Sequence, residues 1–171
     1  IANTYLANNA IDRTLEDMGV VSIPIGGCDS IKHWVSLDLL QTLNKPFFIY
    51  LDSDKERDED ESPNAQKLIT HGFLEEQNFL VSRKRELENY IAPSALERLV
   101  PGCGVNFTDW CDVKYISKTH NRQVSLGGKK IASKHFGSLT FEELKSTYNP
   151  TENDDEFLKV YGKLSELVGE A

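Results

Sequence analysis

Residues 47–54, which read FFIYLDSD, constrain the fold of this 171-residue chain more than any other stretch. The apolar run that follows Pro46 predicts a buried strand, because aromatic and β-branched side chains are enriched in strands. Asp52 and Asp54 follow at alternate positions, so an extended backbone would put both carboxylates on one face at the carboxyl end of that strand. Ligands of open α/β sheets bind at this end. The stretch therefore predicts an acidic site at the edge of a parallel sheet.

Two neighbouring carboxylates repel each other, and a hard divalent cation such as Mg²⁺ is the usual reason for such an arrangement. An alternative stays open here, namely a strand end that simply enters an acidic loop. Seven of the ten residues from Asp52 to Glu61 are acidic, which is typical of a solvated loop. An EF-hand is excluded, because its sixth position would be Arg57 rather than glycine and its twelfth Pro63 rather than glutamate.

Composition indicates a globular, cytoplasmic protein of one domain or one domain with an appendage. Hydrophobic residues make up 39% of the chain and charged residues 27%. No apolar run approaches the roughly 20 residues that span a bilayer, and no secretory signal is visible, so no membrane partner is expected. Three cysteines (Cys28, Cys103 and Cys111) without metal-site spacing favour a reducing compartment. The net charge of −8 by itself argues against nucleic-acid binding.

Helical and strand patterns alternate through the first hundred residues. We expect helices over 1–18, 31–43, 64–70 and 93–99, a Gly-Gly turn at 26–27, and strands over 20–25, 47–51 and 79–81. The last third is helical, with helices over 108–119, after a capping box at Thr140, and from 153 onward. This alternation is typical of an α/β fold, a parallel sheet flanked by helices, with a helical C-terminal portion. The predicted regions are a core over 1–100 and the helical portion over 101–171.

A second pair of carboxylates, Glu86 and Glu88, follows the predicted strand over 79–81. Because consecutive strands usually lie near one another, we expect these glutamates beside Asp52 and Asp54. Three or four converging carboxylates suit one or two Mg²⁺ or Mn²⁺ ions, as in two-metal phosphoryl transfer. The alternative is the start of a surface helix, where glutamates interact favourably with the helix dipole.

Basic residues gather where acidic ones are missing. Residues 114–136 contain no Asp or Glu but six Lys or Arg, and Arg83, Lys84 and Arg85 precede Glu86 directly. The six are Lys114, Lys118, Arg122, Lys129, Lys130 and Lys134. Basic surface beside a metal-charged acidic centre suits a phosphodiester substrate. Glycines at 127–128 would let the backbone bring Lys129 or Lys130 close to a phosphate, although lysine runs are more often solvated surface.

Three motifs together resemble the topoisomerase–primase (Toprim) domain, and specifically the overcoming-lysogenization-defect (OLD) family of nucleases. They are residues 25–34 (IGGCDSIKHW), residues 48–54 (FIYLDSD) and residues 83–90 (RKRELENY). The resemblance covers about residues 1–100. It implies a Toprim-like Rossmannoid sheet and cleavage or nicking of DNA with Mg²⁺ or Mn²⁺. It also implies an ABC-type ATPase domain upstream, a homo-oligomer formed through that region, and a role in defence against phage.

The resemblance implies roles for particular residues. Asp52, Asp54, Glu86 and Glu88 would be metal ligands, and Lys130 or its neighbour Lys129 would lie near the scissile phosphate. The family also has a glutamate at the end of an initial strand, which would precede Ile1. Either that strand lies upstream, as we expect, or the glutamate is missing for another reason. In both cases we expect this chain alone to be weakly active or inactive.

Two rival functions stay open. A phosphatase of the haloacid-dehalogenase kind also has a strand that ends in Asp-x-Asp, and Asp52 would then be a nucleophile. A non-catalytic binding or regulatory module would keep the fold without the reaction.

Overall fold

The computed structural model describes residues 1–24, 30, 33, 42, 44–120, 124, 126, 134–149, 151 and 153–169. These residues form an α/β structure that contains a small parallel sheet. The strands are β1 (Ile49–Leu51) and β2 (Phe79–Val81). The helices are α1 (Ala2–Ala7), α4 (Pro63–Thr70), α5 (Pro93–Leu99), α6 (Val113–His120), α7 (Phe141–Tyr148) and α8 (Glu156–Gly169), with 3₁₀ turns η1 (Leu87–Tyr90) and η3 (Phe136–Ser138).

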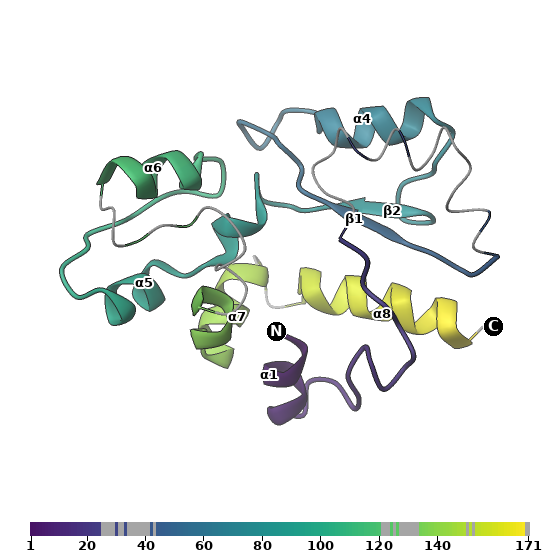
Figure 1. Cartoon of the computed structure of the whole chain (residues 1–171), viewed down its shortest axis with the longest axis horizontal. Helices are drawn as coiled ribbons and strands as arrows, with labels where there is room; N and C mark the ends of the chain where they lie inside the picture. Colours follow the sequence, from purple (N-terminus) through teal and green to yellow (C-terminus); the bar gives the residue numbers. More distant parts are fainter. Residues whose placement is uncertain are drawn as a thin grey trace.

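Strands β1 and β2 pair in parallel, with α4 in the connection between them. Alternation along β1 gives the sheet two faces. Ile49 and Leu51 pack with Leu68 of α4 in one apolar cluster. Tyr50 points to the other face, where its hydroxyl donates a hydrogen bond to Glu156 of α8 at 2.9 Å. The sheet therefore lies between α4 and α8 (Figure 1).

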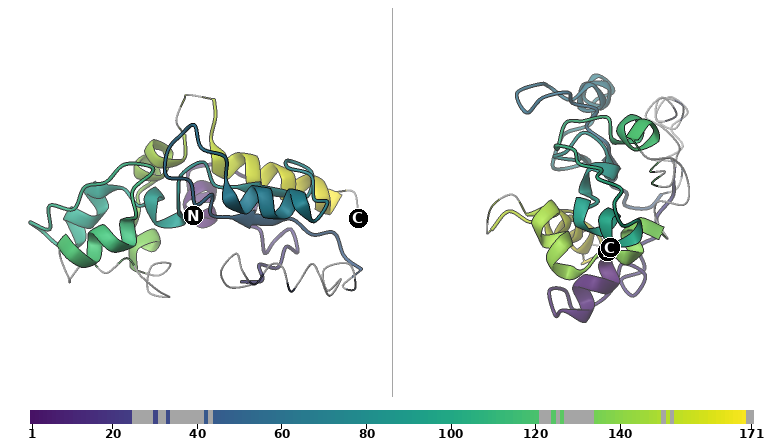
Figure 2. Two further views of the ribbon diagram at one scale, coloured as in Figure 1. Left: turned by 90° about the horizontal axis from the view of Figure 1, so that it is seen from above. Right: turned by 90° about the vertical axis from the view of Figure 1, so that its left-hand side faces the viewer.

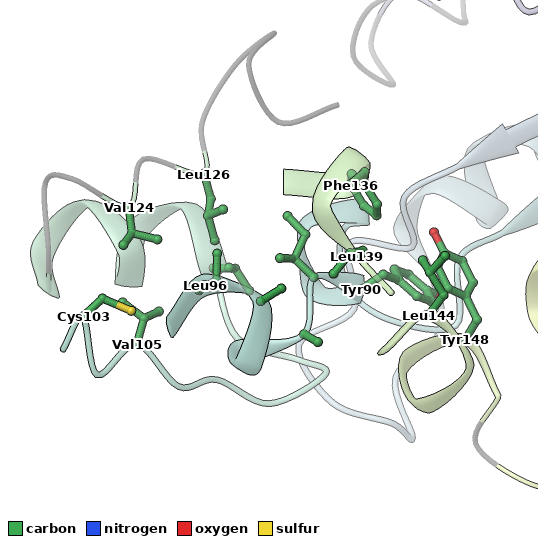
Figure 3. Packing of buried hydrophobic residues seen from close by; sticks show 14 of the residues in the cluster. Tyr90, Leu96, Cys103, Val105, Val124, Leu126, Phe136, Leu139, Leu144 and Tyr148 are labelled. Carbon is green, nitrogen blue, oxygen red and sulfur yellow. The ribbon is translucent and has the colours of Figure 1, made fainter. Parts of the chain in front are cut away.

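A larger core lies beyond the carboxyl ends of the strands, where η1, α5, α6 and α7 gather (Figures 1 and 2). Tyr90 of η1 stacks on Tyr148 of α7 with ring centroids 4.3 Å apart, and Leu96 and Leu144 are fully buried nearby (Figure 3). Tyr5 of α1 belongs to the same cluster. Residues of both predicted regions, 1–100 and 101–171, thus contribute to this core, and the division itself stays a prediction.

Several predicted elements are confirmed. The helices over 64–70 and 93–99 appear as α4 and α5, and the strand over 79–81 is β2. Ser62 caps α4 by accepting the Ala65 N–H at 3.1 Å. The capping box before α7 is also present, because Thr140 Oγ1 accepts the Glu143 N–H while Glu143 accepts the Thr140 N–H.

Two predictions near the N-terminus are wrong. The helix expected over 1–18 ends at Ala7, because Asn9 adopts a positive φ of 56° and Asp17 accepts hydrogen bonds from Thr14 that compete with helical ones. Residues 20–24 of the expected strand over 20–25 are not a strand, and Val21 is 79% exposed. Pro24 cannot donate to a sheet ladder, which fits this outcome.

Two later helices begin further along the chain than predicted. The helix expected from 108 begins at Val113, because Asn89 binds the carbonyls of Thr108 and Cys111 and Asp112 then accepts the Tyr115 N–H at 2.8 Å. The final helix begins at Glu156 rather than 153. The Gly-Gly turn at 26–27 and nearly all of the helix over 31–43 lie outside the described residues.

In the part of the chain that the structure describes, no helix is both long enough and apolar enough to cross a bilayer.

A buried carboxylate attaches α8 to the sheet. Glu156 accepts hydrogen bonds from the Tyr50 hydroxyl at 2.9 Å, from the Tyr90 hydroxyl and from the Arg83 N–H at 2.9 Å. Burial, and then the charge of Glu156, raises the pKa of Tyr90 well above its ordinary value. The two tyrosines therefore stay protonated donors, and one side chain joins β1, η1 and the segment after β2 to the last helix.

We expect Glu156→Ala to lower the free energy of unfolding by about 3 kcal/mol, because two buried hydroxyls and one N–H would lose their acceptor. Urea denaturation followed by circular dichroism measures this change. Glu166→Ala, at an exposed position of the same helix, is the control and should change the free energy by less than about 0.5 kcal/mol. Equal effects of the two substitutions would contradict the assigned role of Glu156.

Candidate functional site

The two chain segments that leave β1 and β2 stay side by side beyond the sheet. The Ser82 N–H donates to Leu51 O at 2.7 Å, and the Ser53 N–H donates to Ser82 Oγ at 3.0 Å. Further along, the Asp54 N–H donates to Arg85 O at 3.0 Å. These bonds extend the parallel pairing by side-chain and backbone contacts. They bring the acidic residues that follow each strand to the same end of the sheet.

A direct contact joins the two predicted acidic pairs. The Leu87 N–H, between Glu86 and Glu88 in the sequence, donates to Asp52 Oδ1 at 2.8 Å. The negative charges of Glu88 and Asp54 both act on the Asp52 carboxyl. The expected proximity of the 52–54 and 86–88 segments is therefore present in the structure.

Asp54 reaches this region by a different route from the one that strand alternation predicts. Strand β1 ends at Leu51, and Asp54 has a positive φ of 55°, so extended geometry does not continue through it. The buried Asn64 at the start of α4 holds this turn, because its Nδ2 donates to Asp54 Oδ2 at 2.8 Å and to Asp52 O at 2.7 Å. The prediction of an extended Asp-x-Asp is wrong, and Asn64 is a site-forming residue that the motif did not reveal.

Helix α4 is tied to the same turn through its cap. The Ser62 hydroxyl donates to Ser53 O at 2.7 Å while its oxygen caps the helix, and Ser53 is completely buried. The acidic loop therefore begins at Ser53 and ends at Ser62 at the same place in the fold.

A lysine from α6 lies between the two glutamates. Lys114 Nζ is 3.3 Å from Glu86 Oε2 and 3.2 Å from Glu88 Oε1. Glu86 immediately precedes η1 and Glu88 lies within it, where Asn89 accepts the Glu86 N–H at 3.1 Å. The sequence places Lys114 in the basic stretch but contains no signal that links it to these glutamates. Only the packing of α6 against η1 creates the contact.

Asp52, Asp54, Glu86 and Glu88 are together termed the acidic cluster. The pKa values of Asp52 and Glu86 are shifted by partial burial and by the charges of their neighbours. Burial raises the pKa of Asp52, and the charges of Glu88 and Asp54 add to that rise. Burial likewise raises the pKa of Glu86, against the opposing effect of Lys114. For Lys114 itself, burial lowers the pKa, but the two glutamates outweigh it and the net pKa is raised. The Lys114 ammonium carries one positive charge, so it neutralises at most one of the two glutamates that it contacts.

The basic cluster at 83–85 does not form the expected exposed surface. Arg83 Nη1 lies 2.6 Å from Asp109 Oδ2, and Lys84 Nζ lies 2.9 Å from Asp109 Oδ1. Lys84 is only 6% exposed, and its Nζ also donates to Asn89 O at 3.0 Å. Asp109 thus holds two of the three cations in ion pairs. The prediction of a basic surface is wrong for Lys84.

The other predicted phosphate contact cannot be placed. Lys129 and Lys130 lie outside the described residues, as do the glycines at 127–128.

The carboxylates suit a hard cation by their chemistry, because Mg²⁺ and Mn²⁺ prefer oxygen ligands. The four carboxylates are not arranged around a common point where such a cation could bind. Among the residues that the structure describes, no three Asp, Glu, His or Cys side chains converge as metal ligands. Asp52 Oδ1 accepts a hydrogen bond from the Leu87 N–H and Asp54 Oδ2 accepts one from Asn64, while Lys114 forms an ion pair with one oxygen of each glutamate.

A hollow of about 340 Å³ opens between the acidic loop, α4 and the end of β2. Lys55, Asp60, Ser82 and Arg83 are among the residues that line it. Its lining includes none of the four candidate metal ligands, so it is separate from the cluster around Asp52.

Comparison of the chain with models of known protein families, with curated proteins and with solved structures finds no match.

The raised pKa of Asp52 gives a pH-dependent prediction. Because the folded state holds this proton more tightly than the unfolded chain, Asp52 contributes stability at pH values below the ordinary carboxyl range, and this contribution is lost as the pH rises through the raised pKa. We expect Asp52→Asn to be more stable than the unmodified chain at neutral pH, by about 1 kcal/mol, and to lose this advantage in acid.

Urea denaturation in metal-free buffer at acidic and neutral pH measures the difference. Asp58→Asn, in the exposed part of the acidic loop, is the control for loss of one negative charge. A destabilised Asp52→Asn protein at neutral pH would contradict the assigned electrostatics.

Proposed function

We propose that this chain is the Toprim-like nuclease module of an OLD-family enzyme, and that it hydrolyses DNA phosphodiester bonds with Mg²⁺ or Mn²⁺. The observation that carries the proposal is the 2.8 Å hydrogen bond from the Leu87 N–H to Asp52 Oδ1, which joins the Asp-x-Asp and Glu-x-Glu motifs. Two separate motifs that resemble one family thereby lie at one place in the fold.

The position of this contact supports the proposal. Both motifs follow parallel strands, and ligands of open parallel sheets bind at the carboxyl ends. Helices cover both faces of the sheet, as in a Rossmannoid fold (Figure 1). A Toprim sheet has more strands than the two described, and the proposal implies that further strands extend this sheet.

Roles follow for the residues of the cluster. Asp52, Asp54, Glu86 and Glu88 would hold one or two divalent cations, which would supply Lewis-acid stabilisation of a phosphate. Lys130 would contact that phosphate. The proposed substrate is DNA, the proposed partner is an ABC-type ATPase domain of the same protein, with a homo-oligomer formed through it, and the proposed setting is phage defence in the cytoplasm.

A second candidate is a non-catalytic module with the same fold. The Lys114 contacts favour it, because an internal cation already pairs with two of the four carboxylates. Metal binding without DNA cleavage would support this candidate over the nuclease.

Cleavage of supercoiled plasmid in Mn²⁺ tests the nuclease. We expect Asp52→Ala to reduce the nicking rate by about 100-fold or more, because it removes a group proposed to act at the reacting phosphate. Asp58→Ala removes an equivalent charge from the exposed part of the acidic loop and should leave the rate unchanged. Full nicking by Asp52→Ala would overturn the assignment. Because this chain alone is expected to be weakly active or inactive, the same comparison is made in the full-length protein with the expected upstream strand, where absence of nicking together with Mn²⁺ binding would favour the non-catalytic module.

A further inference from the structure

The Lys114 ammonium lies between two of the four candidate metal ligands, Glu86 and Glu88. It lies 3.3 Å from an oxygen of Glu86 and 3.2 Å from an oxygen of Glu88. The two glutamate side chains are only 13% and 9% exposed. Carboxylates that are so little hydrated need a cation nearby, since burial of an unpaired charge is costly.

The backbone of Lys114 is held firmly, whereas its side chain has access to solvent. Val113 is completely buried in the larger core, and Asp112 caps the first turn of α6 by accepting the Tyr115 N–H. The Lys114 side chain is nevertheless 42% exposed. A four-carbon stem with this exposure lets the ammonium leave the glutamates by rotation of side-chain bonds, without movement of the helix.

A divalent cation and the Lys114 ammonium repel each other if both bind the same carboxylate oxygens. A Mg²⁺ ion binds carboxylate oxygens at about 2.1 Å, which would place it close to an ammonium that contacts the same two side chains. The like charges would repel strongly in this partly buried setting. Binding of one cation to Glu86 and Glu88 therefore opposes binding of the other.

We propose that Lys114 is an internal counter-ion that closes the carboxylate cluster in the metal-free protein and is displaced when a divalent cation binds. The inference rests on the metal-binding role of the proposed function and adds a competing residue to it. It accounts for the described arrangement, in which the acidic motifs meet but no three ligands surround a metal. It also assigns Lys114 to regulation of metal affinity rather than to contact with the substrate.

Calorimetric titration with MnCl₂ tests the competition. We expect Lys114→Met to tighten the apparent Kd for Mn²⁺ about tenfold relative to the unmodified chain, which corresponds to about 1.4 kcal/mol. Lys114→Arg, which keeps the positive charge, should remain within about threefold of the unmodified chain, a difference of about 0.6 kcal/mol.

Lys163→Met is a matched control. Lys163 is 40% exposed and pairs with Glu166 of α8 at 3.4 Å, so its substitution removes a paired ammonium of similar exposure away from the cluster. It should leave the Kd unchanged. Equal Kd values for Lys114→Met and Lys163→Met, or weaker binding by Lys114→Met, would overturn the proposal.

A second measurement needs no substitution. Acetylation of lysines by an amine-reactive ester, read by mass spectrometry, reports the accessibility of each ammonium. Saturating Mn²⁺ should raise the acetylation rate of Lys114 severalfold and leave that of Lys163 unchanged, because the displaced ammonium enters solvent. An unchanged or slower rate at Lys114 in the Mn²⁺-bound protein would overturn the inference.

Failure of this inference differs from failure of the proposed function. Mn²⁺ binding and nicking without a response at Lys114 would leave the nuclease assignment standing and remove the internal counter-ion. Tight Mn²⁺ binding by Lys114→Met, together with absence of nicking by the full-length protein, would support the counter-ion and count against the nuclease. Absence of Mn²⁺ binding by every variant would overturn both.

Discussion

The parallel pairing of β1 with β2, continued by Ser53 and Ser82 beyond the sheet, is the constraint on which the remaining structure depends. It brings together two segments that are about thirty residues apart in the sequence. Their apolar residues form a thin layer between α4 and α8, and their polar residues leave the same end. The location of the acidic cluster is thus a consequence of strand direction, because parallel strands direct both carboxyl ends to one edge.

Different polar groups stabilise the two sides of this layer. Toward α8, the buried Glu156 carboxylate accepts hydrogen bonds from Tyr50, Tyr90 and Arg83, and these three donors compensate for its burial. At the strand ends, by contrast, burial and like charges raise the pKa of Asp52. The first arrangement has the features of a structural contact. The second retains like charges that a purely structural site would avoid, which is typical of functional sites.

Local patterns were sufficient for much of the fold. Short helices with a capping serine or threonine or a first-turn proline, as in α4, α5 and α7, could be predicted because their signals lie within a few residues. The strand over 79–81 and the pairing of two acidic motifs also followed from the sequence. The prediction of a long helix over 1–18 was wrong because the positive φ of Asn9 and the hydrogen bonds from Thr14 to Asp17 end the helical geometry. The apolar pattern still marks buried residues such as Ile11 and Met18. The prediction of a strand around Val21 was also wrong. A local apolar run does not form a strand unless another strand pairs with it, and Pro24 cannot donate to such a pairing.

The sequence by itself determined the α/β class, the two acidic motifs and their common position at the ends of consecutive strands, since these depend on residue type and order. Only the tertiary structure decided which side chains neutralise the charges. Lys114 reaches Glu86 and Glu88, Asp109 binds Arg83 and Lys84, and Asn64 holds Asp54 in a left-handed turn. The packing of the helices and loops determines which of these side chains come into contact. An ion pair between distant residues leaves no periodic signal in the chain, because it depends on distance in space rather than on separation in sequence.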